Sequence, residues 1–100
     1  MKMSTIFELV SFKVKNADKA AQLRREAMEH AKQFKGFINY RALTNTEDPT
    51  LFTDLVEWAS LEDAQAAAEK VMTLPEFQAM MSEIEAVESM KHFSIDKIVE

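Results

Sequence analysis

The apolar residues of "IFELVSFKV" (6–14) predict a first strand, although apolar and polar positions alternate only imperfectly along it. This stretch is rich in β-branched and aromatic side chains, which favour strands. One face of the strand would carry Ile6, Glu8, Val10, Phe12 and Val14, and the other would carry Phe7, Leu9, Ser11 and Lys13. Both faces begin with apolar side chains, so we expect both to be covered.

A helical repeat follows the first strand, and either Asn16 or Asp18 can cap its start. The helix is predicted to end just before Gly36, because a helix stop needs a left-handed residue that glycine adopts without strain. The apolar stripe of this helix consists of Ala20, Leu23, Ala27, Ala31 and Phe34. His30 falls inside the same stripe.

Residues 37–44 and 51–59 read as two further strands, and the polar segment 45–49 between them predicts a hairpin. Ser60 and Asp63 then resemble a capping box, so a second helix should begin there.

Thr73 and Glu76 repeat the capping pattern, and Pro75 suits the first turn of a new helix. We therefore expect a break near 73–75, a short helix, and a last strand over about 88–98.

The predicted order, β-α-β-β-α-β, favours one ferredoxin-like α+β domain spanning residues 1–100. Right-handed crossovers would give a four-stranded antiparallel sheet with helices on one face. The other face would leave apolar side chains of the first strand bare, which invites association. The simplest solution is a homodimer in which two sheets pack face to face, a dimeric α/β barrel.

Composition narrows the possible functions. The net charge is −5, so an electrostatic surface for nucleic acid or anionic membranes is not expected. The chain has no cysteine, which excludes disulfides, thiolate metal sites and iron–sulfur clusters. A single glycine argues against nucleotide-phosphate cradles. The first residues are too charged for a signal peptide and no apolar stretch is long enough to span a membrane, so we expect a cytoplasmic protein.

Three segments carry a resemblance to a known family: "FKGFINYRAL" (34–43), "FTDLVEWASLEDAQAA" (52–67) and "LPEFQAMM" (74–81). In this order they resemble the antibiotic biosynthesis monooxygenase-like superfamily, the dimeric α/β-barrel proteins, over nearly the whole chain. The resemblance implies a homodimer with an apolar pocket between helices and sheet in each subunit. Its members include cofactor-free oxygenases acting on polycyclic phenols or quinols, haem-degrading enzymes and proteins without known activity.

The haem-degrading branch is disfavoured. Its pattern resembles an Asn in the first strand, a Trp at the end of the third and a His in the short helix. Trp58 matches, but residues 6–14 contain no Asn, and Met80 and Met81 stand where the His is expected.

Trp58 and His30 are candidate site residues with two interpretations each. Trp58 either packs between sheet and helix or lines a pocket, and its N–H needs a partner in both cases. His30 is either a hydrogen-bonded core histidine or a catalytic group that binds or deprotonates a phenolic hydroxyl. Phe77, beside Met80 and Met81, would complete a soft pocket wall.

The remaining polar candidates are weaker. His92 has no partner at metal-ligand spacing, so no metal and no other cofactor are expected. Asn39 and Arg41 share a face and could bind an oxyanion, although a solvated or dimer-edge role is favoured. Asp54 shares a face with Trp58, and Glu8 is expected to pair with an Arg or Lys across the dimer.

Three functions remain open. The first is a cofactor-free monooxygenase acting on a small aromatic or quinol-type compound, with Trp58, Phe77 and Met81 around the ligand. The second is a non-catalytic protein that binds a small hydrophobic molecule in the same pocket. The third is a structural dimer whose pocket has closed.

Overall fold

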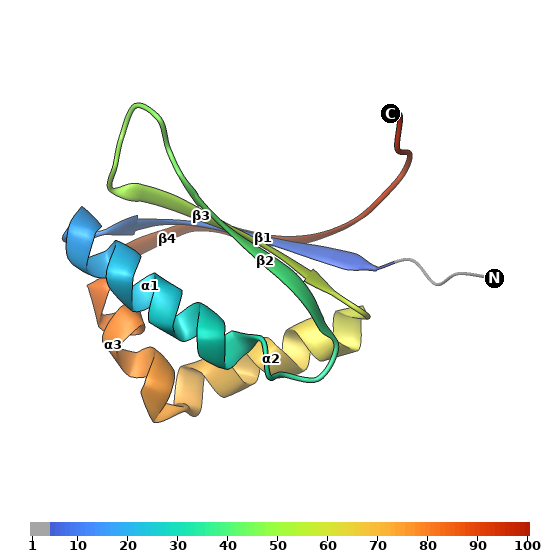
Figure 1. Ribbon diagram of the computed structural model, residues 1–100, viewed down its shortest axis with the longest axis horizontal. Helices are drawn as coiled ribbons and strands as arrows, with labels where there is room; N and C mark the ends of the chain where they lie inside the picture. Colours follow the sequence, from blue (N-terminus) through green and yellow to red (C-terminus); the bar gives the residue numbers. More distant parts are fainter. Residues whose placement is uncertain (1–4) are drawn as a thin grey trace.

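The computed structural model describes residues 5–100, and its elements follow the predicted order with the second helix divided in two (Figure 1). They are β1 (Ile6–Val14), α1 (Ala17–Ala31), β2 (Phe37–Thr44), β3 (Leu51–Trp58), α2 (Leu61–Thr73), α3 (Pro75–Glu83) and β4 (Ile84–Ser94). The four strands form one sheet in the order β2-β3-β1-β4, and every neighbouring pair is antiparallel. All three helices lie on one face of this sheet, which confirms the ferredoxin-like prediction.

Polar caps fix the starts of α1 and α2. Asn16 accepts a hydrogen bond from the backbone N–H of Lys19 at 3.0 Å, and Ser60 accepts one from Asp63 at 3.1 Å. Each cap satisfies a donor that the first turn of a helix leaves free. The cap at Ser60 was predicted, and Asn16 is one of the two caps that the sequence offered for α1.

The predicted capping box at Thr73 is wrong. The N-cap of α3 is Leu74, which offers no side-chain oxygen, and the hydroxyl of Thr73 donates to the carbonyl of Lys70 instead. Pro75 occupies the first turn of α3, where its missing N–H costs no hydrogen bond.

Two elements also differ from the prediction in their boundaries, and β4 spans Ile84–Ser94 instead of about 88–98. Helix α1 ends at Ala31 rather than near Gly36, because residues 32–36 form a separate turn into β2. Gly36 adopts φ +82° in this turn, and its carbonyl accepts the N–H of Ala59 at 2.7 Å. Strand β4 begins at Ile84 rather than near 88, because α3 passes into it directly and Ile84 pairs with Val14.

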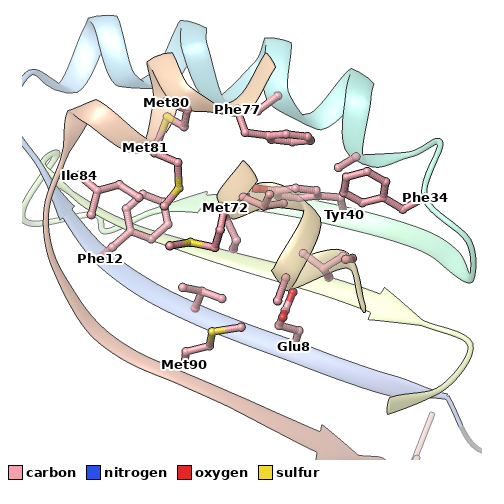
Figure 2. Close-up of a pocket in the computed structure, with 18 of the residues that line it drawn as sticks. Glu8, Phe12, Phe34, Tyr40, Met72, Phe77, Met80, Met81, Ile84 and Met90 are labelled. Carbon is pink, nitrogen blue, oxygen red and sulfur yellow. Dashed lines mark hydrogen bonds between the residues drawn. The ribbon is translucent and has the colours of Figure 1, made fainter. Parts of the chain in front are cut away.

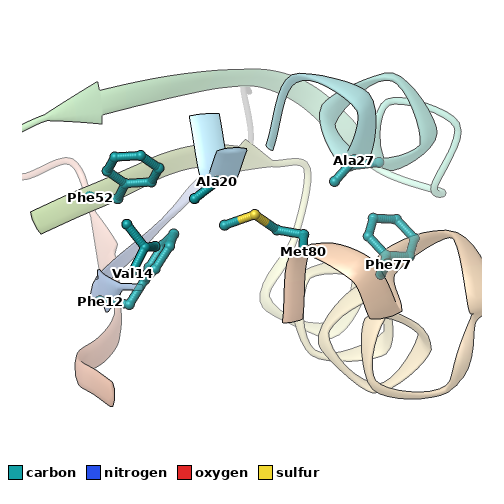
Figure 3. Packing of buried hydrophobic residues seen from close by; sticks show 8 residues of the cluster. Phe12, Val14, Ala20, Ala27, Phe52, Phe77 and Met80 are labelled. Carbon is teal, nitrogen blue, oxygen red and sulfur yellow. The ribbon is translucent and has the colours of Figure 1, made fainter. Parts of the chain in front are cut away.

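The core lies between α1, α3 and the inner face of the sheet (Figure 3). Phe12 of β1 and Phe52 of β3 meet edge to face with their ring centroids 5.9 Å apart. Ala20 and Ala27 of α1 belong to the same cluster, and their small side chains let α1 approach the sheet closely. A second cluster places Val56 and Trp58 against Ala64 and Ala67 of α2.

The outer face of the sheet carries no helix among residues 5–100. Leu9 of β1 and Leu55 of β3 are direct cross-strand partners on this face, and both are half-buried. Beside them Ser11 and Thr53 share a hydrogen bond of 2.9 Å. Phe93 of β4, opposite Phe7, is 47% exposed. The face is therefore mixed, with an apolar strip that runs across β1.

None of the helices within the described part of the chain combines the length and the apolar character needed to cross a membrane.

Candidate functional site

A cavity of about 350 Å³ lies between the inner face of the sheet and the helices (Figure 2). Figure 2 shows Glu8 and Met90 at its floor, with Phe77, Met80 and Met81 on the opposite side. Its size falls in the range of small-molecule sites. An engineered apolar cavity of about 150 Å³ holds one benzene ring, so this space can accept a compound of two rings.

The wall of the cavity is almost entirely apolar. Strands contribute residues that alternate toward the helices, and α2 and α3 contribute small and flexible side chains. The apolar lining residues are Val10, Phe12, Ala27, Ala31, Phe34, Val56, Ala67, Ala68, Val71, Met72, Phe77, Met80, Met81, Ile84, Val87 and Met90. The other four lining residues are Glu8, Tyr40, Asp54 and Trp58. Such a wall selects hydrophobic or aromatic ligands and leaves orientation to a few polar groups.

Glu8 is the first of these polar groups, and it is only 8% exposed. Its Oε1 accepts the indole N–H of Trp58 at 3.4 Å, and its Oε2 lies 3.4 Å from Nε2 of His92. Burial raises the pKa of the Glu8 carboxyl, and the contacts with Trp58 and His92 offset part of that rise. A carboxyl in this environment can exchange a proton closer to neutral pH than an exposed glutamate.

Tyr40, Asp54 and Arg24 form a second polar group. The hydroxyl of Tyr40 donates to Oδ2 of Asp54 at 2.5 Å, and Nη1 of Arg24 donates to Oδ1 at 3.1 Å. Burial and the adjacent Asp54 carboxylate raise the pKa of Tyr40 well above its ordinary value. Burial also raises the pKa of Asp54, while Tyr40 and Arg24 oppose that rise. Tyr40 therefore stays protonated, and its hydroxyl remains hydrogen-bonded to Asp54.

Three predicted pocket residues, Trp58, Phe77 and Met81, line the cavity. Trp58 also packs edge to face on Phe37, with ring centroids 5.8 Å apart, so its packing and pocket-lining interpretations both hold. His30 does not line the cavity. It is exposed on α1, and its ring meets Phe77 from outside at 6.2 Å between centroids. Its predicted place inside the buried stripe is wrong, and its catalytic role stays a prediction without a cavity contact.

The expected pairing of Glu8 with an Arg or Lys across a dimer stays a prediction, and within the chain Glu8 contacts Trp58 and His92. Glu8 faces the helices, on the same side of β1 as Phe12. Asn39, in contrast, points to the outer face and donates to Glu57 at 2.9 Å, and Arg41 is exposed. Neither lines the cavity.

Residues 5–100 contain no cluster of three or more histidine and carboxylate side chains that could hold a metal ion.

Arg24 is the site residue that sequence reasoning missed. It is 5% exposed and its guanidinium lies 3.9 Å over the ring of Phe52. Its spacing from Ala20 and Ala27 offered a signal, since positions four and three apart share one helix face. Arginine is almost never fully buried unless it is paired, and here Asp54 provides the pairing charge.

Several solved structures share this fold. A protein assigned as an antibiotic biosynthesis monooxygenase from Bordetella bronchiseptica superposes with a TM-score of 0.81 at 13% identity, covering 97% of this chain and 100% of its own. A counterpart from Chloroflexus aurantiacus J-10-fl gives 0.71 at 19% identity, covering 97% and 98%. SnoaB of Streptomyces nogalater, a cofactor-independent oxygenase, gives 0.69 at 11% identity, covering 98% and 97%. At these identities the likeness concerns the fold.

Among curated proteins, none matches this sequence. A family profile does match, over residues 5–83, and this range includes β1, both polar groups of the cavity and the whole of α3. The chain belongs to the antibiotic biosynthesis monooxygenase family.

Proposed function

We propose that the chain binds a small aromatic compound of the phenol or quinol type in its cavity and oxidises it with molecular oxygen, without a cofactor. The observation that carries this proposal is an almost wholly apolar cavity with aromatic walls and a buried carboxylate at its floor. SnoaB, which shares the fold, is a cofactor-independent oxygenase. In such a reaction the electron-rich ligand would supply the electrons that reduce oxygen.

The lining residues would contact the ligand in different ways. Trp58 and Phe77 offer ring faces and edges against which an aromatic ligand packs favourably. Met81 has a flexible thioether that adapts to the ligand outline. The cavity wall has no lysine or arginine among its lining residues, so a neutral ligand is favoured over a carboxylate.

Binding is tested by fluorescence. Trp58 is the only tryptophan of the chain, so any change in indole emission on adding naphthol reports occupancy of the cavity. The variant Ala68→Phe places a ring in the cavity and should abolish the change. Ala66→Phe is the matched control, because Ala66 is exposed on the same helix and does not line the cavity. Equal titrations for the two variants would place the ligand elsewhere.

Turnover is tested by oxygen uptake with a panel of quinols and no added metal or cofactor. Uptake that saturates with quinol and disappears in Ala68→Phe supports the oxygenase. Saturable binding without uptake favours the alternative, a non-catalytic binding protein that uses the same cavity.

We further propose a homodimer formed through the outer face of the sheet. Leu9 and Leu55 lie side by side in an uncovered apolar strip, and burying such a strip against a second copy removes it from water. Light scattering after size exclusion should give twice the monomer mass. Leu9→Lys should return the monomer, whereas Lys91→Ala, at an exposed position opposite Leu9 on β4, should not.

A further inference from the structure

Glu8 lies between the cavity and His92. Its carboxylate points into the cavity floor from β1 (Figure 2). His92 is its cross-strand partner on β4. His92 does not line the cavity, although its Nε2 comes within 3.4 Å of Oε2 of Glu8. The carboxylate is therefore reached by a ligand from one side and by the imidazole from the other.

The hydrogen bonds of this pair are incomplete. Oε1 of Glu8 receives the indole N–H of Trp58, whereas Oε2 has the imidazole of His92 beside it, with Nε2 3.4 Å away. Nε2 of His92 is buried and has no hydrogen-bond partner among the described residues. A carboxylate oxygen with free lone pairs at the floor of an apolar cavity is a strong acceptor for a donor brought by a ligand.

Few charged or titratable groups lie near Glu8, so few of them can compete with a hydrogen-bond donor on the ligand. The groups with charge or titratable protons near Glu8 are His92 on β4, Asp54 on β3 and Tyr40 on β2, and the helices add only apolar lining residues. Asp54 is already engaged by Arg24 and Tyr40. Glu8 is thus the one lining carboxylate, among residues described, that is open to a ligand.

We propose that Glu8 accepts the hydroxyl proton of a phenolic ligand, and that His92 acts from behind as a positioning residue that keeps Glu8 ionised. This inference rests on the proposed function and names the proton acceptor of that site. The phenolic O–H bond breaks, its electron pair stays on the ring oxygen, and the proton forms an O–H bond with Oε2. The products are a phenolate and a neutral carboxylic acid, so the charge of the pair is unchanged.

This assignment explains the ligand class. A phenol can donate to Oε2, whereas its methyl ether fits the same apolar space and cannot donate. A carboxylate ligand would place a second negative charge beside Glu8. We therefore expect the protein to prefer a naphthol over its methyl ether by roughly tenfold in affinity, as for one hydrogen bond to a charged group.

The experiment uses para-nitrophenol, whose neutral and ionised forms absorb at different wavelengths. The probe is bound to the full chain at a pH where the free probe is neutral. In the wild type the bound probe should show absorbance displaced toward the ionised form, because it shares its proton with Glu8. Glu8→Gln keeps the size of the side chain and an acceptor for Trp58 but cannot take a proton, so its bound probe should absorb as the neutral form. Glu85→Gln, at an exposed position on β4, is the matched control.

His92 provides a second and independent readout. Its charge lowers the pKa of Glu8, so His92→Gln should move the loss of the displaced absorbance to higher pH than in the wild type. A residue with only a packing role would not shift that midpoint. This measurement also decides the matter if Glu8→Gln does not fold.

The outcomes separate the two proposals. If the wild type binds neither para-nitrophenol nor naphthol, the proposed function fails and this inference fails with it. If both bind but the absorbance is that of the neutral form in wild type and Glu8→Gln alike, the cavity stands and the role of Glu8 is overturned. The same holds if naphthol and its methyl ether bind equally well.

Discussion

Arg24 on α1 holds Asp54 on β3 through a contact of 3.1 Å between Nη1 and Oδ1, with both side chains largely withdrawn from water. The same guanidinium also donates to the carbonyl of Leu43 at 3.1 Å. One arginine thus ties the first helix to two strands beside the cavity. Its charge is matched by Asp54 and its flat face lies on Phe52, which is how such a group tolerates burial.

Removing this arginine should be costly. Arg24→Met leaves the Asp54 carboxylate buried without its cation, and we expect the free energy of unfolding to fall by about 3 kcal/mol. Denaturant unfolding followed by circular dichroism measures the loss. The double variant Arg24→Met with Asp54→Asn removes both charges and should recover part of it. A single variant as stable as the wild type would show that the pair contributes little.

Gly36 should not tolerate a side chain. Its φ of +82° disfavours every L-residue, and a Cβ built there would lie 2.2 Å from Oδ2 and 2.6 Å from Cβ of Asp63. We expect Gly36→Ala to lower the free energy of unfolding by about 2 kcal/mol or more.

Thermal unfolding measures the effect of Gly36→Ala, with exposed Lys35→Ala as its neighbour control. Adding Asp63→Ala should relieve only part of the loss, because the Cβ of Asp63 remains in the way. Full recovery in the double variant would mean that the backbone conformation carries no cost.

Glu8 should make the fold less stable as pH rises. Burial raises its pKa above the ordinary 4.5, so the folded state favours the protonated form. The associated stability is present below about pH 4.5 and is lost as the pH rises through the folded pKa. Glu8→Gln should therefore unfold at higher denaturant than the wild type at neutral pH, with the two curves converging in acid. The opposite order at neutral pH would contradict burial as the dominant influence on this carboxyl.

Asp48 should act in the opposite sense. Its ion pair with Lys13 and its bonds from the hydroxyl and N–H of Thr50 lower its pKa from 3.8 to about 2. This stability is present above pH 3.8 and is lost as the pH falls through about 2. Asp48→Asn should therefore be less stable than the wild type near neutrality and equal to it in strong acid. Lys13→Met, which keeps the Thr50 contacts, should show a smaller loss across the same pH series.

The order of the elements could be predicted because local signals marked it. Asn16 and Ser60 cap their helices as the sequence indicates, and the even spacing from Phe52 to Trp58 puts alternate residues on the inner face. The errors arose where a tertiary contact decides. Strand β4 starts at Ile84 because Ile84 pairs with Val14, a partner that lies 70 residues away in sequence and leaves no local trace.

The residues of the candidate site also differ in whether local sequence or tertiary contacts determine their roles. Trp58 stands at the end of a strand and Phe77 lies beside Met81 in one apolar segment, and all three line the cavity. These features are local in the sequence. The polar groups were not predictable, since their roles depend on neighbours from other elements. The role of Glu8 depends on Trp58 and His92, which come from other strands. His30 is exposed because the buried face of α1 is formed by Ala20, Arg24, Ala27 and Ala31.

The hollow between helices and sheet has a mechanical consequence. Volume that no atom fills in the folded chain is eliminated on unfolding, so hydrostatic pressure acts against the folded state in proportion to it. Any part of the pocket of about 350 Å³ from which the apolar wall excludes water adds to this volume, so this domain should yield to compression sooner than a fully packed one of its size. An occupant would fill the void, and pressure resistance would then rise with occupancy.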